Sequence, residues 1–307
     1  MAKVKFTYKP INAKETCEEY KISKAQLASC YFRIKDPKSS VSHVLAQLGK
    51  ALLVYSSLNY DHGQLVKSTV YGTTDFTEKL IFSYLLGMSA CKWVSEEIFD
   101  IPNLQYFSLT KKSDPLFNNN VSGTKCPDLL GEHNGNYWLF EAKGTGGSFD
   151  PKQIATGKGQ LQNIAICGKT PTGIVTESYF DNDIFSIYAE DPRPTMMKNI
   201  KYDPATVIEN YYKNVMSLLN YRKREIDGRY VFTDCLEPYH RPYRTQYRTP
   251  VNRHVYEIQI GLDKRIFDAY VEKDYSKILN TINEYTESTI DEDEFISRDG
   301  ISFKIIE

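Results

Sequence analysis

The sequence lacks several features that would place it in a common class at once. Its six cysteines are scattered without a Cys-x-x-Cys pair, which argues against a zinc module and favours a reducing compartment over a disulfide scaffold. The opening MAKVKFTYKP has no apolar core of the kind that a signal peptide needs. The most apolar stretch, LIFSYLLGMSACKWV, is too short and too mixed to span a bilayer. We therefore expect a soluble cytoplasmic protein with no membrane partner.

A strong charge of one sign is also missing from the chain as a whole. The formal net charge over 307 residues is −1, so no overall positive field draws the protein to nucleic acid or acidic membranes. The sequence has no Walker-type loop, no Ser-His-Asp order and no haem motif, and its five histidines have no ligand-like spacing. Any surface that binds a polyanion must therefore be a local patch.

What is present is an ordinary globular composition, with 41% hydrophobic and 25% charged residues. Alternation and helical periodicity divide the chain into elements. The expected strands are 3–9, 68–74, 103–111, 173–180, 185–190, 254–260 and 301–306, and the expected helices are 39–58, 75–94, 150–168, 202–226 and 274–287. Together with two strands between 126 and 147, the order from 75 to 190 predicts an α/β (α+β) fold, in which helices cover a mixed sheet.

Two of these helices carry recognisable signals. Helix 75–94 is the clearest, because it has an apolar stripe made of Phe76, Leu80, Ile81, Tyr84, Leu85 and Met88. Glu78 falls on the same stripe. Helix 150–168 can begin with Asp150 as the N-cap and Pro151 at the first position, and Gly168 can end it.

The most informative segment is CPDLLGEHNGNYWLFEAKGTGG, residues 126–147. Asn134-Gly135 between two apolar runs is a strong hairpin signal. With those two residues as the turn, Asp128 faces Glu141 directly across the ladder, and alternation places Lys143 on the same face as Glu141. That face also carries Leu130 and Leu139, whereas the other carries Leu129, Trp138, Phe140 and Ala142. Both faces are apolar, which predicts a central strand pair with three charges at one end.

Two opposed acids in such a position require a positive charge between them. Like charges directly across a sheet destabilise it, and burial raises the cost. Lys143 supplies part of that charge, and a hard divalent cation with oxygen ligands, Mg²⁺ or Mn²⁺, is the natural remainder. The alternative is a buried salt-bridge cluster in which Lys143 only neutralises the acids. The combination of residues at hairpin register favours the functional interpretation.

Pro127-Asp128, twelve intervening residues and then Glu141-Ala142-Lys143 resemble the motif of the PD-(D/E)XK nuclease superfamily. The resemblance covers residues 75 to 190 and implies a restriction-endonuclease-like core. It also implies that Asp128 and Glu141 ligate the metal, with the Ala142 carbonyl as a further ligand. Lys143 would then orient or deprotonate the attacking water and offset charge on the phosphate.

The resemblance divides the chain into three regions. Residues 1–72 form an N-terminal accessory region, 73–200 the nuclease-like core, and 201–307 a helical and basic region that packs on the core.

Two helical residues are candidates for completing the site. The superfamily often places an acid on the helix before the sheet, which makes Glu78 a candidate metal ligand. Its alternative role is a first-turn glutamate favoured by the helix dipole. Gln160 lies on the helix after Lys143, where related nucleases often have a polar residue near the site. Its alternative role is an ordinary exposed glutamine.

A candidate nucleic-acid contact lies in YHRPYRTQYRTPVNRHVY, residues 239–256. Arginines pair with phosphates and tyrosines stack on bases, so the interleaving is typical of such a surface. The residues concerned are Arg241, Arg244, Arg248, Arg253, Tyr243 and Tyr247. The alternative is a solvated loop whose tyrosines pack on the core.

Three hypotheses follow from these patterns. The first is a metal-dependent nuclease, more readily for DNA than for RNA, in restriction or anti-phage defence, acting as a homodimer or with a partner subunit. The second is a catalytically silent nuclease-like module that binds nucleic acid or a partner protein. The third is a structural domain with a buried ion-pair cluster. Metal binding that depends on Glu141 separates the third hypothesis from the others, and cleavage separates the first from the second.

Overall fold

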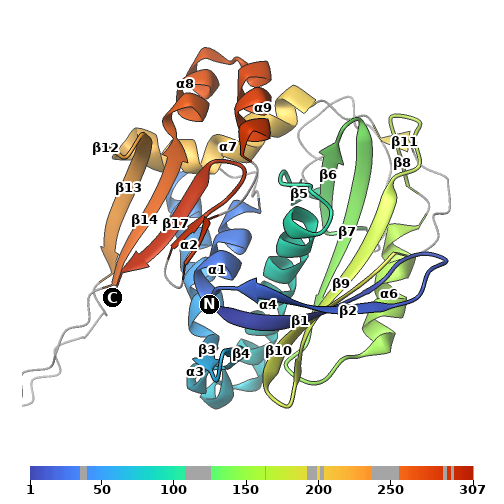
Figure 1. Cartoon of the computed structure of the whole chain (residues 1–307). Helices are drawn as coiled ribbons and strands as arrows, with labels where there is room; N and C mark the ends of the chain where they lie inside the picture. The colour runs from blue at the N-terminus through green and yellow to red at the C-terminus, as the bar shows by residue number, and fades with distance from the viewer. Residues whose placement is uncertain are drawn as a thin grey trace, which may run out of the picture.

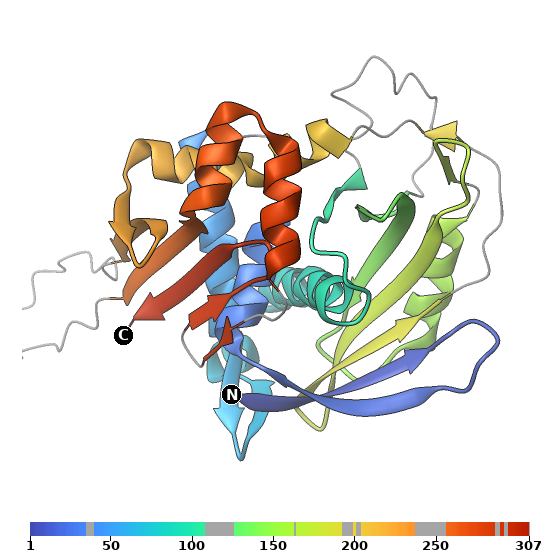
Figure 2. The ribbon, with the colours of Figure 1, turned by 45° about the horizontal axis from the view of Figure 1, so that its top comes forward.

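Two β-sheets organise the chain, and a layer of helices lies between them (Figures 1 and 2). The computed structural model describes residues 1–34, 40–107, 126–162, 164–191, 199–200, 204–236, 256–285, 289–291 and 294–306. The first sheet consists of β1 (Ala2–Lys9), β2 (Thr16–Ile22), β3 (Leu58–Asp61), β4 (Gln64–Lys67), β5 (Gln105–Tyr106), β6 (Leu129–His133), β7 (Asn136–Gly144), β9 (Thr172–Asp181) and β10 (Ile184–Glu190).

This nine-stranded sheet is mixed, as the sequence predicts. Strands β2, β1, β10, β9, β7, β6 and β5 follow one another, and β4, itself paired with β3, joins β1 and β10 at their ends. The pairs β7–β9 and β1–β10 are parallel, whereas β6–β7 and β9–β10 are antiparallel. Residues 1–72 therefore contribute four strands to the same sheet as the candidate nuclease core.

The second sheet belongs to the C-terminal part of the chain. Its six strands are β12 (Arg224–Ile226), β13 (Arg229–Leu236), β14 (Tyr256–Asp263), β17 (Ile301–Ile306), β16 (Glu294–Ile296) and β15 (Thr289–Ile290), in that order. A separate short sheet pairs β8 (Ala165–Ile166) with β11 (Asn199–Ile200). Residues 201–307, which were expected to form a helical and basic region, thus also contain a six-stranded antiparallel sheet.

Helices cover both faces of the large sheet. The helices are α1 (Lys24–Arg33), α2 (Val41–Ser56), α3 (Thr69–Thr73), α4 (Phe76–Glu97), α6 (Pro151–Leu161), α7 (Pro204–Tyr221), α8 (Lys264–Glu272) and α9 (Tyr275–Glu284). Figures 1 and 2 show α1, α2 and α4 between the two sheets, with α6 on the opposite face of the large sheet. No described helix is long and apolar enough to cross a membrane.

Side-chain caps set where several helices begin. The Ser23, Ser40, Asp75 and Asp150 side chains each accept a hydrogen bond from a backbone N–H in the first turn of α1, α2, α4 and α6. Such caps satisfy donors that a helix end would otherwise leave unpaired. The predicted cap at Asp150, with Pro151 directly after it, is confirmed.

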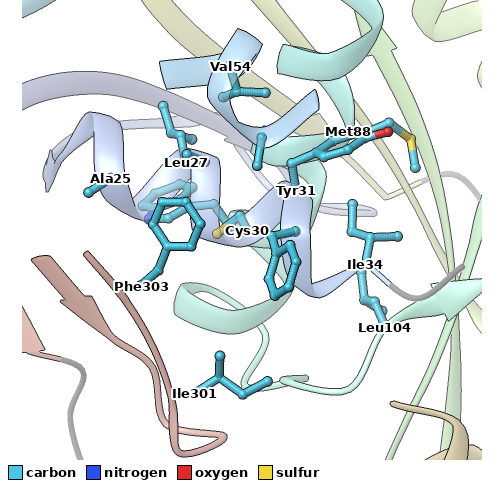
Figure 3. Packing of buried hydrophobic residues seen from close by; sticks show 14 of the residues in the cluster. Ala25, Leu27, Cys30, Tyr31, Ile34, Val54, Met88, Leu104, Ile301 and Phe303 are labelled. Carbon is cyan, nitrogen blue, oxygen red and sulfur yellow. The ribbon is translucent and has the colours of Figure 1, made fainter. Parts of the chain in front are cut away.

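The main apolar core fills the space around α1. Figure 3 shows side chains of α1, among them Leu27 and Tyr31, between Val54 and Met88 on one side and Phe303 of β17 on another. All five are at most 2% exposed, so the helical layer and both sheets share one continuous core.

A buried ionic cluster lies in the same layer. The Arg33 guanidinium of α1 pairs with Glu96 of α4, and it also pairs at 2.9 Å with Asp299, which lies before β17. Lys92 pairs with Glu96 at 2.8 Å. Arg33, Lys92 and Asp299 have fully buried side chains, and the Tyr211 hydroxyl of α7 donates to Asp299. The cluster therefore links α1, α4, α7 and the second sheet.

Several predicted elements differ from the observed ones. Residues 68–74 contain helix α3 rather than a strand, because the Ser68 side chain caps the turn and Tyr71 is buried against Phe82 and Phe180. Helix α6 ends at Leu161 rather than near Gly168, because the chain beyond it turns into β8 and pairs with β11.

Other boundaries differ nearer the C-terminus. Helix α7 ends at Tyr221, because Arg224–Ile226 pairs with β13. Helix α8 follows β14 without having been predicted, and Asp263 provides its cap. The predicted strand 103–111 is described only as far as 107, and only Gln105–Tyr106 forms a strand there.

Candidate active site

The hairpin of β6 and β7 has the predicted register. Leu130 pairs with Leu139 and Leu129 with Phe140, which places Asp128 opposite Glu141 at the end of the ladder. Asn134 and Gly135 form the turn with φ values of 50° and 73°, as a two-residue turn of the mirror-image type requires.

The two faces of the hairpin also match the prediction. Leu130 and Leu139 pack with Ile154 and Leu161 of α6, whereas Leu129 and Phe140 belong to the core on the α4 side. The charged residues Glu141 and Lys143 therefore lie on the face that α6 covers.

The two acids meet at this end of the hairpin. One carboxylate oxygen of Asp128 accepts the Ala142 N–H at 2.9 Å, and the Asp128 N–H donates to the Phe140 carbonyl at 3.1 Å. Burial raises the pKa of Asp128, although the Ala142 N–H and the Lys143 charge oppose the shift. Asp128 is thus a partly buried acid aimed at the backbone of the opposite strand.

Glu141 has the most strongly perturbed titration in the site. Its side chain is 1% exposed, and burial together with the neighbouring Asp128 charge raises its pKa to about 8, against the opposing effect of Lys143. Glu141 Oε1 accepts a hydrogen bond from Lys143, but Oε2 is buried and has no hydrogen-bond partner among the described residues. Two carboxyl groups placed together in a buried site must share a proton, which forms a hydrogen bond between Glu141 and Asp128, or share a bound cation.

Lys143 connects the acids to helix α6. Its ammonium pairs with Glu141 and donates to Gln160 Oε1 at 2.9 Å, and Gln160 Nε2 donates to the Cys126 carbonyl at 3.2 Å. The predicted set of Asp128, Glu141, Lys143 and Gln160 is therefore brought together by β6, β7 and α6. Gln160 is not the freely exposed glutamine of the alternative interpretation, because both ends of its amide are bonded inside the site.

A glycine lets α6 lie this close to the acids. A Cβ atom at Gly157 would lie 2.6 Å from Val175 Cγ1 and 3.2 Å from Glu141 Cγ. The first distance is shorter than real Cβ contacts, so an alanine at this position would have to displace Val175 or move the helix away from Glu141.

Two further glycines, Gly87 and Gly144, allow α4 to pack closely on the face of β7 opposite α6. A Cβ at Gly144 would collide with the Ser83 carbonyl, and one at Gly87 would lie 2.6 Å from the Lys143 carbonyl oxygen. The backbone that follows the acids is thus held between two helices, α4 and α6.

The residues fit a divalent cation in chemistry but do not form a closed cage. Asp128 and Glu141 supply carboxylates, and Oε2 of Glu141 has a free coordination position within the described part of the chain. The Ala142 N–H donates to Asp128. In a β-strand the N–H and the C=O of one residue point to the same side, so the Ala142 carbonyl also points to the side on which Asp128 lies. No group of three or more His, Cys, Asp or Glu suited to a metal occurs among the described residues. Mg²⁺ commonly keeps several waters and needs only one or two carboxylates.

Glu78 is not part of this cluster. It is exposed in the first turn of α4, where its N–H donates to the Asp75 cap, and no third acid of the described residues joins Asp128 and Glu141. The predicted apolar stripe is wrong in the same region: Leu85 and Met88 are buried, but Phe76, Leu80, Ile81 and Tyr84 are all 47% exposed or more. From Leu85 to Glu96 α4 is enclosed by the sheet and by α1 and α2, so periodicity in its first turns does not mark its buried face.

Glu177 is a second buried acid that the sequence analysis missed. It pairs with Lys143 in the β7–β9 register and is 0% exposed, and its Oε1 accepts the Asp150 N–H at the start of α6 at 3.0 Å. Burial is the main cause that raises the pKa of Glu177 to about 7, and its Oε2 has no partner within the described ranges. The available signal was a lone acid in the apolar strand GIVTESYF.

The predicted nucleic-acid contact lies outside the described residues. Residues 237–255 include Arg241, Arg244, Arg248 and Arg253 together with Tyr243 and Tyr247. Their role stays a prediction from the sequence.

Comparisons with protein-family models, with curated proteins and with solved structures found no match to this chain.

Proposed function

We propose that this chain is a metal-dependent nuclease that hydrolyses phosphodiester bonds, with a restriction-endonuclease-like core. The observation that carries the proposal is the meeting of Asp128 and Glu141 beside Lys143, with one oxygen of Glu141 buried and without a partner among the described residues. A divalent cation between the two carboxylates would replace the proton that they otherwise share. By analogy with the superfamily that the motif resembles, the substrate is DNA rather than RNA. The same analogy places the activity in restriction or anti-phage defence.

The proposed cation is Mg²⁺, with Mn²⁺ as its substitute. Asp128, Glu141 and the Ala142 carbonyl would hold it, and the remaining positions would be left to water and phosphate. When bound, the ion polarises the phosphoryl oxygen and lowers the pKa of a bound water.

The remaining chemistry belongs to the protein itself. The Lys143 ammonium, held by Glu141 and Gln160, is fixed at the edge of the acid pair, where it can orient a water and offset charge that builds up on the phosphate. Its side chain is 19% exposed, so it can reach both the buried acids and an incoming substrate. Gln160 positions Lys143 and ties α6 to the chain just before Asp128.

The test is metal-dependent cleavage by the purified chain. Plasmid, linear duplex DNA, single-stranded DNA and RNA are incubated with Mg²⁺, Mn²⁺ or EDTA. Lys143→Ala and Glu141→Gln are expected to lower the cleavage rate by about 100-fold or more, because each removes a group at the reacting centre. Lys152→Ala is the matched control, since Lys152 is an exposed lysine on α6 and its side chain lies outside the acid–lysine site.

Each result of this experiment has a defined meaning. Cleavage that needs metal, is lost in Lys143→Ala and is kept in Lys152→Ala supports the proposal. No cleavage, combined with a metal-dependent rise in melting temperature that Glu141→Gln abolishes, would favour the catalytically silent module. Absence of both cleavage and any response to metal would leave a structural ion-pair cluster.

A further inference from the structure

A surface groove of about 650 Å³ lies at the same end of β7 as the acids, and the proposed chemistry does not use it. The loop at Thr145–Gly147, helix α3 and the first turns of α4 line most of it. Thr145 follows Lys143 by two residues, which is roughly 7 Å along an extended chain. The loop that lines the groove therefore follows directly along the chain from the strand end that carries Lys143.

The groove displays an aromatic ring to solvent. Phe76, in the first turn of α4, is 76% exposed, and Leu80, one turn later, is 54% exposed. Both line the groove, whereas α4 from Phe82 onward is almost entirely buried. An exposed apolar patch in a groove indicates a contact surface, because burying it costs the partner little and removes apolar area from water.

Lysines flank this ring. Lys67 and Lys79 line the groove together with a single acid, Asp183, which leaves an excess of one positive charge. Lys67 pairs with Asp183 at 2.7 Å, and its ammonium also lies 5.0 Å from the Phe180 ring centroid. The surface thus combines an exposed aromatic ring with one cation in excess, Lys79, in a chain whose net charge is −1.

Two glycines, Gly146 and Gly147, line another part of the groove. A Cβ at Gly146 would collide with the Tyr71 hydroxyl, and the Gly147 carbonyl accepts the Phe180 N–H at 2.9 Å. The loop is therefore held against α3 and β9, and its lack of side chains leaves room for a strand to pass.

We propose that this groove binds an unpaired nucleotide segment next to the scissile bond, with a base stacked on Phe76 and a phosphate beside Lys79. An aromatic platform beside cations is the arrangement by which proteins hold single strands without sequence preference. The inference rests on the proposed function and names its substrate class, a nucleic acid with a single-stranded segment beside the cleavage point.

The test measures binding separately from cleavage. A fluorescein-labelled oligothymidylate of about ten nucleotides is titrated with the full chain in EDTA, and fluorescence anisotropy gives the affinity. Phe76→Ala should weaken binding about fivefold or more, and Phe76→Trp should keep it, because stacking needs an aromatic face. Lys79→Ala should weaken binding and reduce its salt dependence.

Two control variants match these changes in exposure and chemistry. Val70→Ala removes an apolar side chain that is 48% exposed on α3 but does not line the groove, and Lys50→Ala removes an exposed lysine on α2. Both should bind the oligonucleotide like wild type, and the melting temperature of Phe76→Ala should be unchanged.

Failure of the wild type to bind the oligonucleotide, or equal binding by wild type, Phe76→Ala and Lys79→Ala, would overturn the inference. The inference would also be wrong if Phe76→Ala only dissociated a dimer and left oligonucleotide binding unchanged. Plasmid cleavage, measured in parallel, separates the two proposals. If the wild type cleaves the plasmid but Phe76→Ala and Lys79→Ala bind the oligonucleotide as well as wild type does, the proposed role of the groove is wrong and the nuclease proposal stands. If oligonucleotide binding requires Phe76 but the wild type cleaves nothing, the nuclease proposal is wrong and the groove still binds single strands.

Discussion

At the scale of single residues, Glu141 is the group on which the site depends. It is enclosed by α6, faces another acid and keeps one oxygen without a partner within the described part of the chain. With its pKa raised to about 8, Glu141 carries a proton at neutral pH when no cation is bound. Lys143 lessens this shift but does not remove it, so a further positive charge would stabilise the carboxylate.

Cation binding should therefore release a proton. A divalent ion needs the Glu141 carboxylate, so at pH 7 it should displace about one proton per site. Because the pKa of Glu141 is raised to about 8, the apparent affinity should increase as the pH rises toward that value and level off above it. Titration calorimetry with Mn²⁺ in two buffers of different ionisation enthalpy measures the released proton.

Glu177→Gln provides the comparison for this measurement. Glu177 is also a buried acid with a raised pKa, but it bonds to the start of α6 rather than to Lys143. Its replacement should leave the proton release unchanged, whereas Glu141→Gln should abolish it together with binding. Proton release that persists in Glu141→Gln would show that another group holds the cation.

At the scale of elements, the sequence predicted the hairpin well because its signals are local. Asn134-Gly135 fixed the turn, and alternation then determined the register and both faces of β6 and β7. The Asp150 cap placed Gln160 on α6, and the resemblance to the nuclease superfamily suggested its closeness to the site, where it contacts Lys143.

Errors arose where distant parts of the chain decide the structure. The ends of α6 and α7 depend on strand pairing with β11 and β13, which short-range patterns do not contain. Glu78 is exposed because the first turns of α4, with Phe76, Leu80 and Ile81, face solvent, whereas the helix is enclosed on all sides only from Leu85 to Glu96. Glu177 was missed because its neighbours across the sheet are distant in sequence.

Two glycines of α6 should respond in opposite ways to alanine. A Cβ at Gly157 would press on Val175 and Glu141, so Gly157→Ala should lower the free energy of unfolding by about 1–3 kcal/mol and reduce cleavage by shifting Gln160 and Lys143. A Cβ at Gly159 has nothing within 4 Å, so Gly159→Ala should raise the free energy of unfolding by about 0.5–1 kcal/mol through helix propensity. Urea unfolding and cleavage rates check both. Equal effects of the two variants would show that α6 does not pack on Glu141 as described.

At the scale of the whole molecule, the two sheets are joined by the helical layer and by the ionic cluster around Arg33. This guanidinium contacts Glu96 of α4 and Asp299 beside β17, and both acids are almost completely buried. The positive charge of Arg33 holds the pKa of Glu96 below its usual range against the effect of burial. Because α4 also packs against β7 beside the acids, the attachment of the second sheet and the shape of the site share one helix.

Loss of Arg33 should therefore destabilise the protein far more than loss of a surface arginine. Arg33→Ala leaves Glu96 and Asp299 buried with Lys92 as the remaining cation, so the free energy of unfolding should fall by about 3–5 kcal/mol. Arg224→Ala is the matched control, because Arg224 is exposed on the edge strand β12, and its loss should cost about 1 kcal/mol or less. Chemical unfolding at neutral pH measures both changes. If the two variants had equal stability, the cluster would not hold the sheets together, and the apolar core around α1 would account for their attachment.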